Sequence, residues 1–209
     1  MFGKSKNEKI KGSDWEATDV ASYMLHAIWD LGDSVTNIKL QKLLFFAQAE
    51  YLVRTGGKRL FRDDLILSED KLIVRSVYDK YRCCGLMPIS PQPESDGDTP
   101  LHTLRDLWNK GEDCTPGSVI AIVLQKYLPY SGLDLNAMIY NVIGPRIDSW
   151  QRGRESIIST NELRERYEAA TQEAEEIINR IEKRIEIQRQ MEKGQDDSQS
   201  HIAEHSLNG

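Results

Sequence analysis

TNIKLQKLLFFAQAEYL, residues 36–52, is the stretch that decides the fold. Thr36 or Asn37 can cap a helix here, because short polar side chains accept hydrogen bonds from the free N–H groups of a first turn. The helix should run to about Thr55 and end at Gly56-Gly57, since glycine readily adopts the left-handed conformation that follows many helices. This helix carries two apolar faces, which predicts that it is buried on two sides.

Polar residues separate these two apolar faces. One face carries Leu40, Leu44, Ala47 and Tyr51, and the other carries Ile38, Phe45, Phe46, Ala49 and Leu52. Lys39, Glu50 and Arg54 are expected to form a solvated edge. Asn37, Gln41 and Gln48 form an amide seam, and buried amides without hydrogen-bond partners cost roughly 1–3 kcal/mol each. Two interpretations stay open for these amides: ties between neighbouring segments of the core, or a strip that binds a partner.

Helices should make up most of the remaining domain, with little strand. A first helix is expected over 19–31, where Thr18 precedes an apolar repeat and Gly32 provides a stop. The elements expected beyond residue 57 are a strand at 65–67, a helix at 72–84, a short strand at 86–89, a proline-rich loop at 88–100 and helices at 101–110, 115–127 and 134–142. Thr115-Pro116 suits a helix start, and Gly144-Pro145 is expected to end the last of these helices.

From residue 161 to 193 the sequence is highly charged and contains neither proline nor glycine. A narrow apolar seam recurs there at alternating spacings of four and three residues, the pattern of a helix that packs against another helix. The seam consists of Leu163, Tyr167, Ala170, Ala174, Ile177 and Ile181, and Ile178 and Ile185 continue a neighbouring stripe. The expected organisation is a mobile leader at 1–14, a compact mainly α domain with at most a short β element at 15–160, a long amphipathic helix at 161–193 and a disordered tail at 194–209.

Composition restricts the classes of partner and compartment. The net charge is -6 and the pI is about 5.3, which disfavours a sequence-independent grip on nucleic acid. Lys39 and Lys42 on the 37–55 helix could imitate a recognition helix, but burial on two sides leaves no face for a major groove. The sequence has neither a secretory signal nor an apolar run of about twenty residues. We therefore expect a cytoplasmic protein without membrane contact.

Catalytic and metal motifs are weak. HIAEH at 201–205 fits the H-x-x-E-H pattern that places two imidazoles and a carboxylate on one helical face for zinc hydrolysis. A polar tail, however, offers no third ligand or dry cavity, so we expect no metal. The cysteines, Cys83, Cys84 and Cys114, form no C-x-x-C motif and are interpreted as structural thiols. With no phosphate loop or nucleophile elbow, we expect a binding protein without a cofactor, not an enzyme.

The 36–52 stretch, followed by RLFRDD at 59–64, resembles the opening of the Panacea, or SocA-like, antitoxin domain. Members of that family typically read T-N-L-K-L-Q-K-L-L-Y-Y-A-Q here. The coinciding residues are Thr36, Asn37, Lys39, Leu40, Gln41, Lys42, Leu43, Leu44, Ala47 and Gln48. Val77-Tyr78 matches a later V-Y helix, and Trp150 begins WQRGR where the family carries a Trp followed by basic and small residues. The resemblance covers residues 18–167.

One departure from the family pattern lies ahead of Val77. The family usually has A-W-x-x-G-P-V there, whereas this chain reads LSEDKLI at 67–73, without the Trp, Gly or Pro. Local geometry should therefore differ at this point. If the missing motif shapes a toxin-binding surface, the partner or its mode of binding should differ too.

The resemblance implies an antitoxin that neutralises a cognate protein toxin by direct contact. For some relatives it also implies an adaptor that hands the toxin to an AAA+ protease. The residues expected to bind a partner are Gln41, Lys42, Gln48, Tyr167, Ile177, Ile181 and Ile185. The alternative is a phage or mobile-element accessory protein that forms homo-oligomers through residues 163–185 and has no toxin partner.

Overall fold

The computed structural model describes residues 15–68, 71–90, 114–148 and 155–206; the side chains of Ser68, 145–148, 185 and 187–206 lie outside that description. Within it the chain is mainly helical, with one small three-stranded antiparallel sheet, so the predicted fold class is confirmed. Two compact units are distinguished, Met1–Glu168 and Ala169–Gly209. The first unit therefore extends beyond the boundary expected at residue 160. The predicted leader, the 101–110 helix, most of the 88–100 loop and Trp150 fall outside the described residues.

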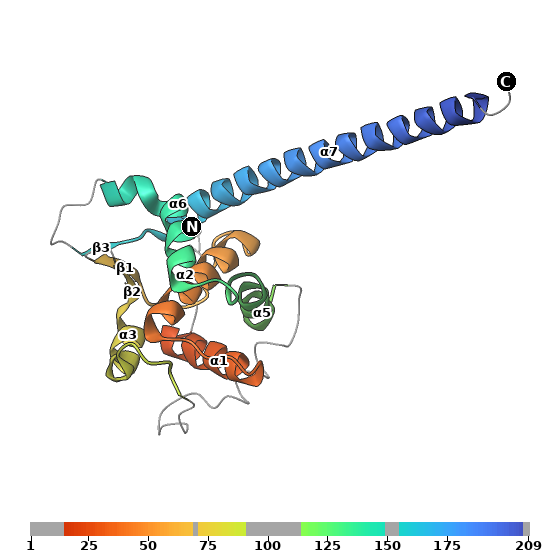
Figure 1. Cartoon of the computed structure of the whole chain (residues 1–209). Helices are drawn as coiled ribbons and strands as arrows, with labels where there is room; N and C mark the ends of the chain where they lie inside the picture. Colours follow the sequence, from red (N-terminus) through yellow and green to blue (C-terminus); the bar gives the residue numbers. More distant parts are fainter. Residues whose placement is uncertain (1–14, 69–70, 91–113, 149–154, 207–209) are drawn as a thin grey trace, which may run out of the picture. The chain divides into compact units, whose positions relative to one another are not determined.

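Helix α2, Asn37–Arg54, is the helix around which the first unit is built (Figure 1). Thr36 caps it: the side-chain oxygen accepts a hydrogen bond from the Lys39 N–H at 3.2 Å. At the other end the Gly57 N–H donates to the Leu52 carbonyl at 2.7 Å, and Gly57 has a φ of 116°. The predicted bounds of this helix are confirmed. Its packing partners are α1 (Ala17–Asp30), α3 (Arg75–Tyr81), α5 (Pro116–Tyr127), α6 (Gly132–Asp148) and the strand β2 (Lys71–Val74).

α1 begins earlier than expected. Its N-cap is Glu16, which forms a capping box with Asp19, so the cap expected at Thr18 is wrong. The Glu16 carboxylate accepts a hydrogen bond from the backbone N–H of Asp19, as a shorter capping side chain would. The Asp19 carboxylate in turn accepts one from the Glu16 N–H at 3.2 Å. The glycine stop at Gly32 is confirmed, with a φ of 76°.

The sheet has the strand order β2-β1-β3, with β1 at Leu65–Ser68 and β3 at Ser156–Ile157. The expected strand at 65–67 is confirmed, but the helix expected from residue 72 is wrong in its first turn. β2 instead pairs with β1 in the register Leu65↔Val74, because β-branched residues pack well on a pleated surface. α3 and the short 3₁₀ helix Arg82–Cys84 then end before Gly85. β3 was not foreseen.

Two further expectations are corrected near the ends of elements. Residues 86–89 form no strand: Thr36 and Pro88 make an isolated bridge, and the Ile89 N–H donates to the Val35 carbonyl at 2.8 Å. Gly144-Pro145 does not end α6, which continues to Asp148. Proline removes a single helical N–H, a defect that a long helix can absorb at a cost of about 3 kcal/mol. The start of α5 at Thr115-Pro116 is confirmed.

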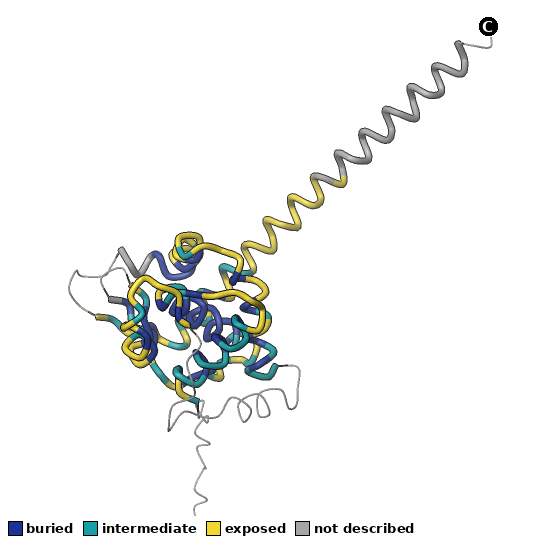
Figure 2. The backbone as a smooth tube through the Cα atoms, turned by 60° about the horizontal axis from the view of Figure 1, so that its bottom comes forward, coloured by how far each residue is buried: buried dark blue, intermediate teal, exposed yellow. Residues whose placement is uncertain are grey.

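Helix α7, Thr160–Ser206, contributes residues to both units. Its first turns belong to the core of the first unit, where Leu163 is 1% exposed. Beyond Glu168 the residues whose burial is described are mostly exposed (Figure 2). The helix continues through Gly194, where the sequence predicts that regular structure ends, because one glycine costs a helix only about 1 kcal/mol.

Candidate functional site

The amides near the start of α2 join it to the sheet and to α3. The Asn37 side-chain nitrogen donates to the Tyr78 carbonyl at 3.0 Å, and its oxygen accepts from the Gln41 side chain at 3.0 Å. The Gln41 oxygen in turn accepts from the backbone N–H of Val74 at 2.7 Å. The Val74 N–H lies on the outer edge of β2, where no further strand pairs with it in the sheet. Gln41, held by Asn37, supplies the acceptor that a neighbouring strand would otherwise provide.

Near the end of α2, Gln48 likewise forms hydrogen bonds with the backbone of a neighbouring segment. Its side-chain oxygen accepts from the backbone N–H groups of Leu60 at 2.9 Å and Phe61 at 3.2 Å, and its nitrogen donates to the Phe61 carbonyl at 3.4 Å. Gln48 is 2% exposed. One amide therefore holds the irregular segment after the helix in place, as an internal substitute for backbone pairing.

Two lysines tie α2 to the turn between α5 and α6. Lys39 Nζ donates to the Leu128 carbonyl at 2.7 Å, and Lys42 Nζ donates to the Gly132 carbonyl at 2.6 Å. Burial lowers the pKa of Lys42 below its ordinary value. Lys39 was expected on a solvated edge, but its ammonium group bonds to the backbone of the neighbouring turn.

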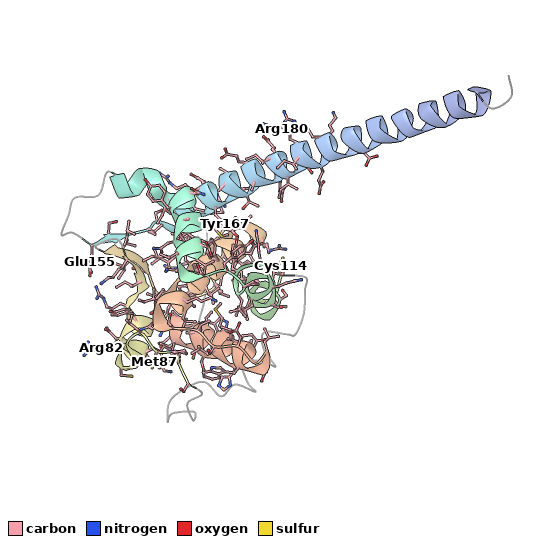
Figure 3. All side chains as sticks on the ribbon, viewed as in Figure 1. Arg82, Met87, Cys114, Glu155, Tyr167 and Arg180 are labelled. Carbon is pink, nitrogen blue, oxygen red and sulfur yellow. The ribbon has the colours of Figure 1, made fainter. Side chains whose placement is uncertain are left out.

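A polar cluster fixes the first turns of α7 against α2 and α5; we call it the anchor cluster, and it consists of Glu50, Arg54, Tyr127 and Tyr167. The Tyr167 hydroxyl donates to Glu50 Oε2 at 2.7 Å and lies 2.9 Å from the Tyr127 hydroxyl. Arg54 Nε donates to Glu50 Oε1 at 2.6 Å. Figure 3 shows Tyr167 at the base of α7, beside the helices of the first unit.

Burial dominates the electrostatics of the anchor cluster. It raises the pKa of Tyr167 far above its ordinary value, with further contributions from Tyr127 and then Glu50. The neutral hydroxyl therefore persists as a donor. Glu50 is 9% exposed, so its placement on a solvated edge is wrong: the 100° projection of α2 alone cannot show that α7 covers it.

Three of the predicted partner-binding residues are internal in this structure. Gln41 and Gln48 are each 2% exposed and Tyr167 is 3% exposed, and all three have partners within the chain. Their prediction as surface contacts is therefore corrected: they are ties that hold the core. Lys42 is 8% exposed and borders a small pocket beside β2.

The remaining predicted contacts lie on α7. Ile177 is 47% exposed and Ile181 is 51% exposed, and Ile178 beside them is 54% exposed. We call these three residues the isoleucine stripe. In Figure 3 the described side chains around Arg180 project from the helix on all sides. Ile185 has the same sequence spacing, but its side chain lies outside the described part of the structure.

The residues on which the resemblance to the antitoxin domain rests have structural roles where they are described. Thr36 caps α2, and Asn37 and Lys39 make the bonds given above. Leu40, Leu44, Ala47 and Val77 are fully buried, and the Tyr78 carbonyl accepts from Asn37. The motif thus specifies the way this helix is embedded. The sequence did not predict the anchor cluster, because Tyr167, which bonds to both Glu50 and Tyr127, lies on a distant element.

Within the described residues, no cluster of three or more His, Cys, Asp or Glu side chains could hold a metal ion. The side chains of HIAEH lie outside that description. The three cysteines are free thiols. Among the helices that are described, none has the length and apolar character to cross a bilayer.

Comparisons with protein-family models, with curated proteins and with solved structures give no match to this chain.

Proposed function

We propose that this protein is an antitoxin that neutralises a cognate protein toxin by direct binding through α7. The toxin is proposed from the resemblance of residues 36–48 to the Panacea antitoxin domain. One observation supports a binding function: the exposure of the isoleucine stripe. Three adjacent isoleucines about half exposed on one helix are unusual on a surface that is otherwise charged, and they offer a partner apolar area to bury.

The spacing of the stripe favours a helical or grooved partner surface. Residues three and four apart lie on one side of a helix, so Ile177, Ile178 and Ile181 can enter one apolar groove together. Charged residues border them, including Glu182 and Arg184. This arrangement of an apolar centre with a polar rim is typical of specific protein interfaces.

The first unit supports this binding helix from its base. Leu163 and Tyr167 are core residues, and the anchor cluster bonds α7 to α2. A deletion from residue 161 onward would remove both core side chains and damage the first unit. A chain that ends after Ala170 is therefore the correct truncation, because it keeps the anchor and removes the stripe.

Co-expression with the protein encoded by the adjacent gene tests the proposal. We expect the neighbour to arrest growth when produced alone and to become harmless when the full chain is present. The variant Ile177→Ser/Ile181→Ser should lose neutralisation and bind the neighbour about thirtyfold more weakly, since central apolar contacts contribute most to an interface.

A matched control is Glu176→Ser/Lys183→Ser. At 100° per residue these two positions lie on the side of α7 opposite the stripe, and the double change leaves the net charge unchanged. This variant should neutralise like the natural chain. A harmless neighbour, toxicity that co-expression does not relieve, or equal binding by the two double variants would contradict the proposal.

Delivery to an AAA+ protease is a further possibility carried by the resemblance alone. Toxin abundance in cells distinguishes it from simple occlusion. Occlusion leaves the toxin level unchanged when the antitoxin is present, whereas delivery lowers it in a manner that depends on the protease.

Self-association is the second candidate function, and the same stripe favours it, because a 3-4 apolar spacing also suits pairing between identical helices. Light scattering on the isolated chain tests this alternative. A dimer that becomes a monomer in the chain ending after Ala170 would favour it, and a monomeric full chain would exclude it.

A further inference from the structure

A small pocket lies where α2, β2, α3 and α6 meet. Its volume is about 140 Å³, and it is lined by Ile38, Gln41, Lys42, Lys71, Leu72, Ile73, Tyr78 and Asn136. Sites for drug-sized molecules commonly measure roughly 300–1,000 Å³. The pocket is thus suited to one modest chemical group, such as a single amino-acid side chain with its carboxylate.

The pocket contains a buried cation, Lys42, which forms no ion pair with any described carboxylate. Lys42 is 8% exposed, and in the described part of the chain its ammonium group is bonded to the Gly132 carbonyl through one of three available N–H donors. Lys71 adds a second positive charge. None of the eight lining residues is acidic. A buried ammonium with spare donors favours an anion, because its desolvation is only partly offset by one carbonyl.

The outer edge of β2 adds a backbone donor. In an antiparallel pair, alternate residues direct their N–H and C=O groups to the same side. The Val74 N–H points away from β1, since it donates to Gln41. Leu72, two residues earlier, therefore directs its N–H to that same outer side, where the pocket lies.

Aliphatic side chains form much of the remaining wall of the pocket, beside Gln41, Tyr78 and Asn136. Ile38, Leu72 and Ile73 contribute aliphatic side chains, and Ile38 is 46% exposed at the rim. An inorganic phosphate would place a doubly charged group against these walls, which is unfavourable. A carboxylate on a short aliphatic body matches both the donors and the walls.

We infer that this pocket binds an aliphatic carboxylate, with Lys42, Lys71 and the Leu72 N–H facing the carboxylate and Ile38 and Ile73 facing the aliphatic part. Two sources carry this chemistry: a free small carboxylic acid, or the C-terminal residue of a peptide. The inference goes beyond the proposed toxin binding and does not depend on it. Lys42, which the sequence predicts to contact a partner, would then bind a carboxylate.

NMR titration of the ¹⁵N-labelled full chain tests the inference. The probes are N-acetylisoleucine, its amide, and the tripeptide acetyl-Thr-Val-Ile with a free or an amidated C-terminus. The free acids should shift the amide signals of Leu72 and Asn136 saturably, and the two amides should not. Saturation by the tripeptide acid alone identifies a peptide C-terminus as the ligand, and equal affinity of N-acetylisoleucine identifies a free acid.

Charge variants complete the test. Lys71→Glu alters an exposed lysine and should weaken binding by about tenfold, the size of one charge-assisted hydrogen bond. Lys42→Met should weaken binding as well, with folding checked in the same spectra. Lys58→Glu makes the same charge change at an exposed site after α2 and should have no effect. The inference is overturned if no probe saturates, if the amides bind as well as the acids, or if Lys71→Glu and Lys58→Glu behave alike.

Discussion

α2 and the part of α7 beyond Glu168 reverse the usual relation between polarity and burial. On α2, Asn37, Gln41 and Gln48 are each 2% exposed. On α7, Ile177 and Ile181 are each about half exposed. The amides are stable inside because each has partners within the chain, whereas the isoleucines have no such cover among the described residues. The comparison shows that available partners, and not residue type alone, decide which positions hold the fold and which are free to bind.

The largest effect on folding is expected for Gln48→Leu. The change removes the acceptor for the Leu60 and Phe61 N–H groups and leaves both in the core, at a cost of about 2–4 kcal/mol in the free energy of unfolding. Chemical denaturation measures this cost. Gln125→Leu, at an exposed position on α5, should change the stability little. If the two variants were equally stable, Gln48 would not be a core tie.

Tyr167→Phe should have the next largest effect. Removing the hydroxyl deprives Glu50 of a buried donor, which costs about 1.5–3 kcal/mol. Tyr140→Phe, at an exposed tyrosine, is the control. Because the folded chain raises the pKa of Tyr167, the unfolded chain loses this proton first as the pH rises, and the stabilisation is lost above the ordinary tyrosine value of about 10.

The penalty of Tyr167→Phe should accordingly be full below that pH and shrink above it. Denaturation of both proteins over a series of alkaline pH values checks the trend. A penalty that grows with pH would contradict the assignment of Tyr167 as a buried neutral donor.

Thr36→Ala should cost about 1 kcal/mol, because it removes the side-chain acceptor for the Lys39 N–H at the start of α2. Thermal unfolding provides the measurement. Ser34→Ala, at an exposed position just before the cap, should leave the midpoint unchanged. A cap effect no larger than that of Ser34→Ala would show that tertiary contacts alone fix this end of the helix.

The smallest effect on folding is expected for Ile177→Ser/Ile181→Ser. Surface substitutions of this kind usually alter stability by less than about 0.5 kcal/mol, while partner binding should fall sharply. Calorimetric unfolding compared with a binding titration separates the two properties. A large loss of stability would mean that the stripe is part of a core, and the contrast with α2 would fail.

Local signals in the sequence were sufficient to predict α2. Thr36 and Gly56-Gly57 mark its ends, and two apolar faces predict burial. The partners of its polar residues were not predictable in the same way. Gln41 bonds to Val74 in a segment expected to be helical, and Glu50 was assigned to solvent because its cover comes from Tyr167 on α7. Periodicity describes one helix at a time, whereas hydrogen-bond partners depend on how distant elements meet.

The hydrogen bond between Tyr167 and Glu50 joins residues 117 positions apart in the sequence. Among the described core residues, Tyr167 is the last in chain order. During synthesis the core of the first unit therefore cannot close until residue 167 has left the ribosome, and contacts of such long range slow folding. A newly made chain completes its core only as the isoleucine stripe begins to emerge. Completion of the core and exposure of the stripe are thus coupled in time, and a chain terminated before Tyr167 can achieve neither.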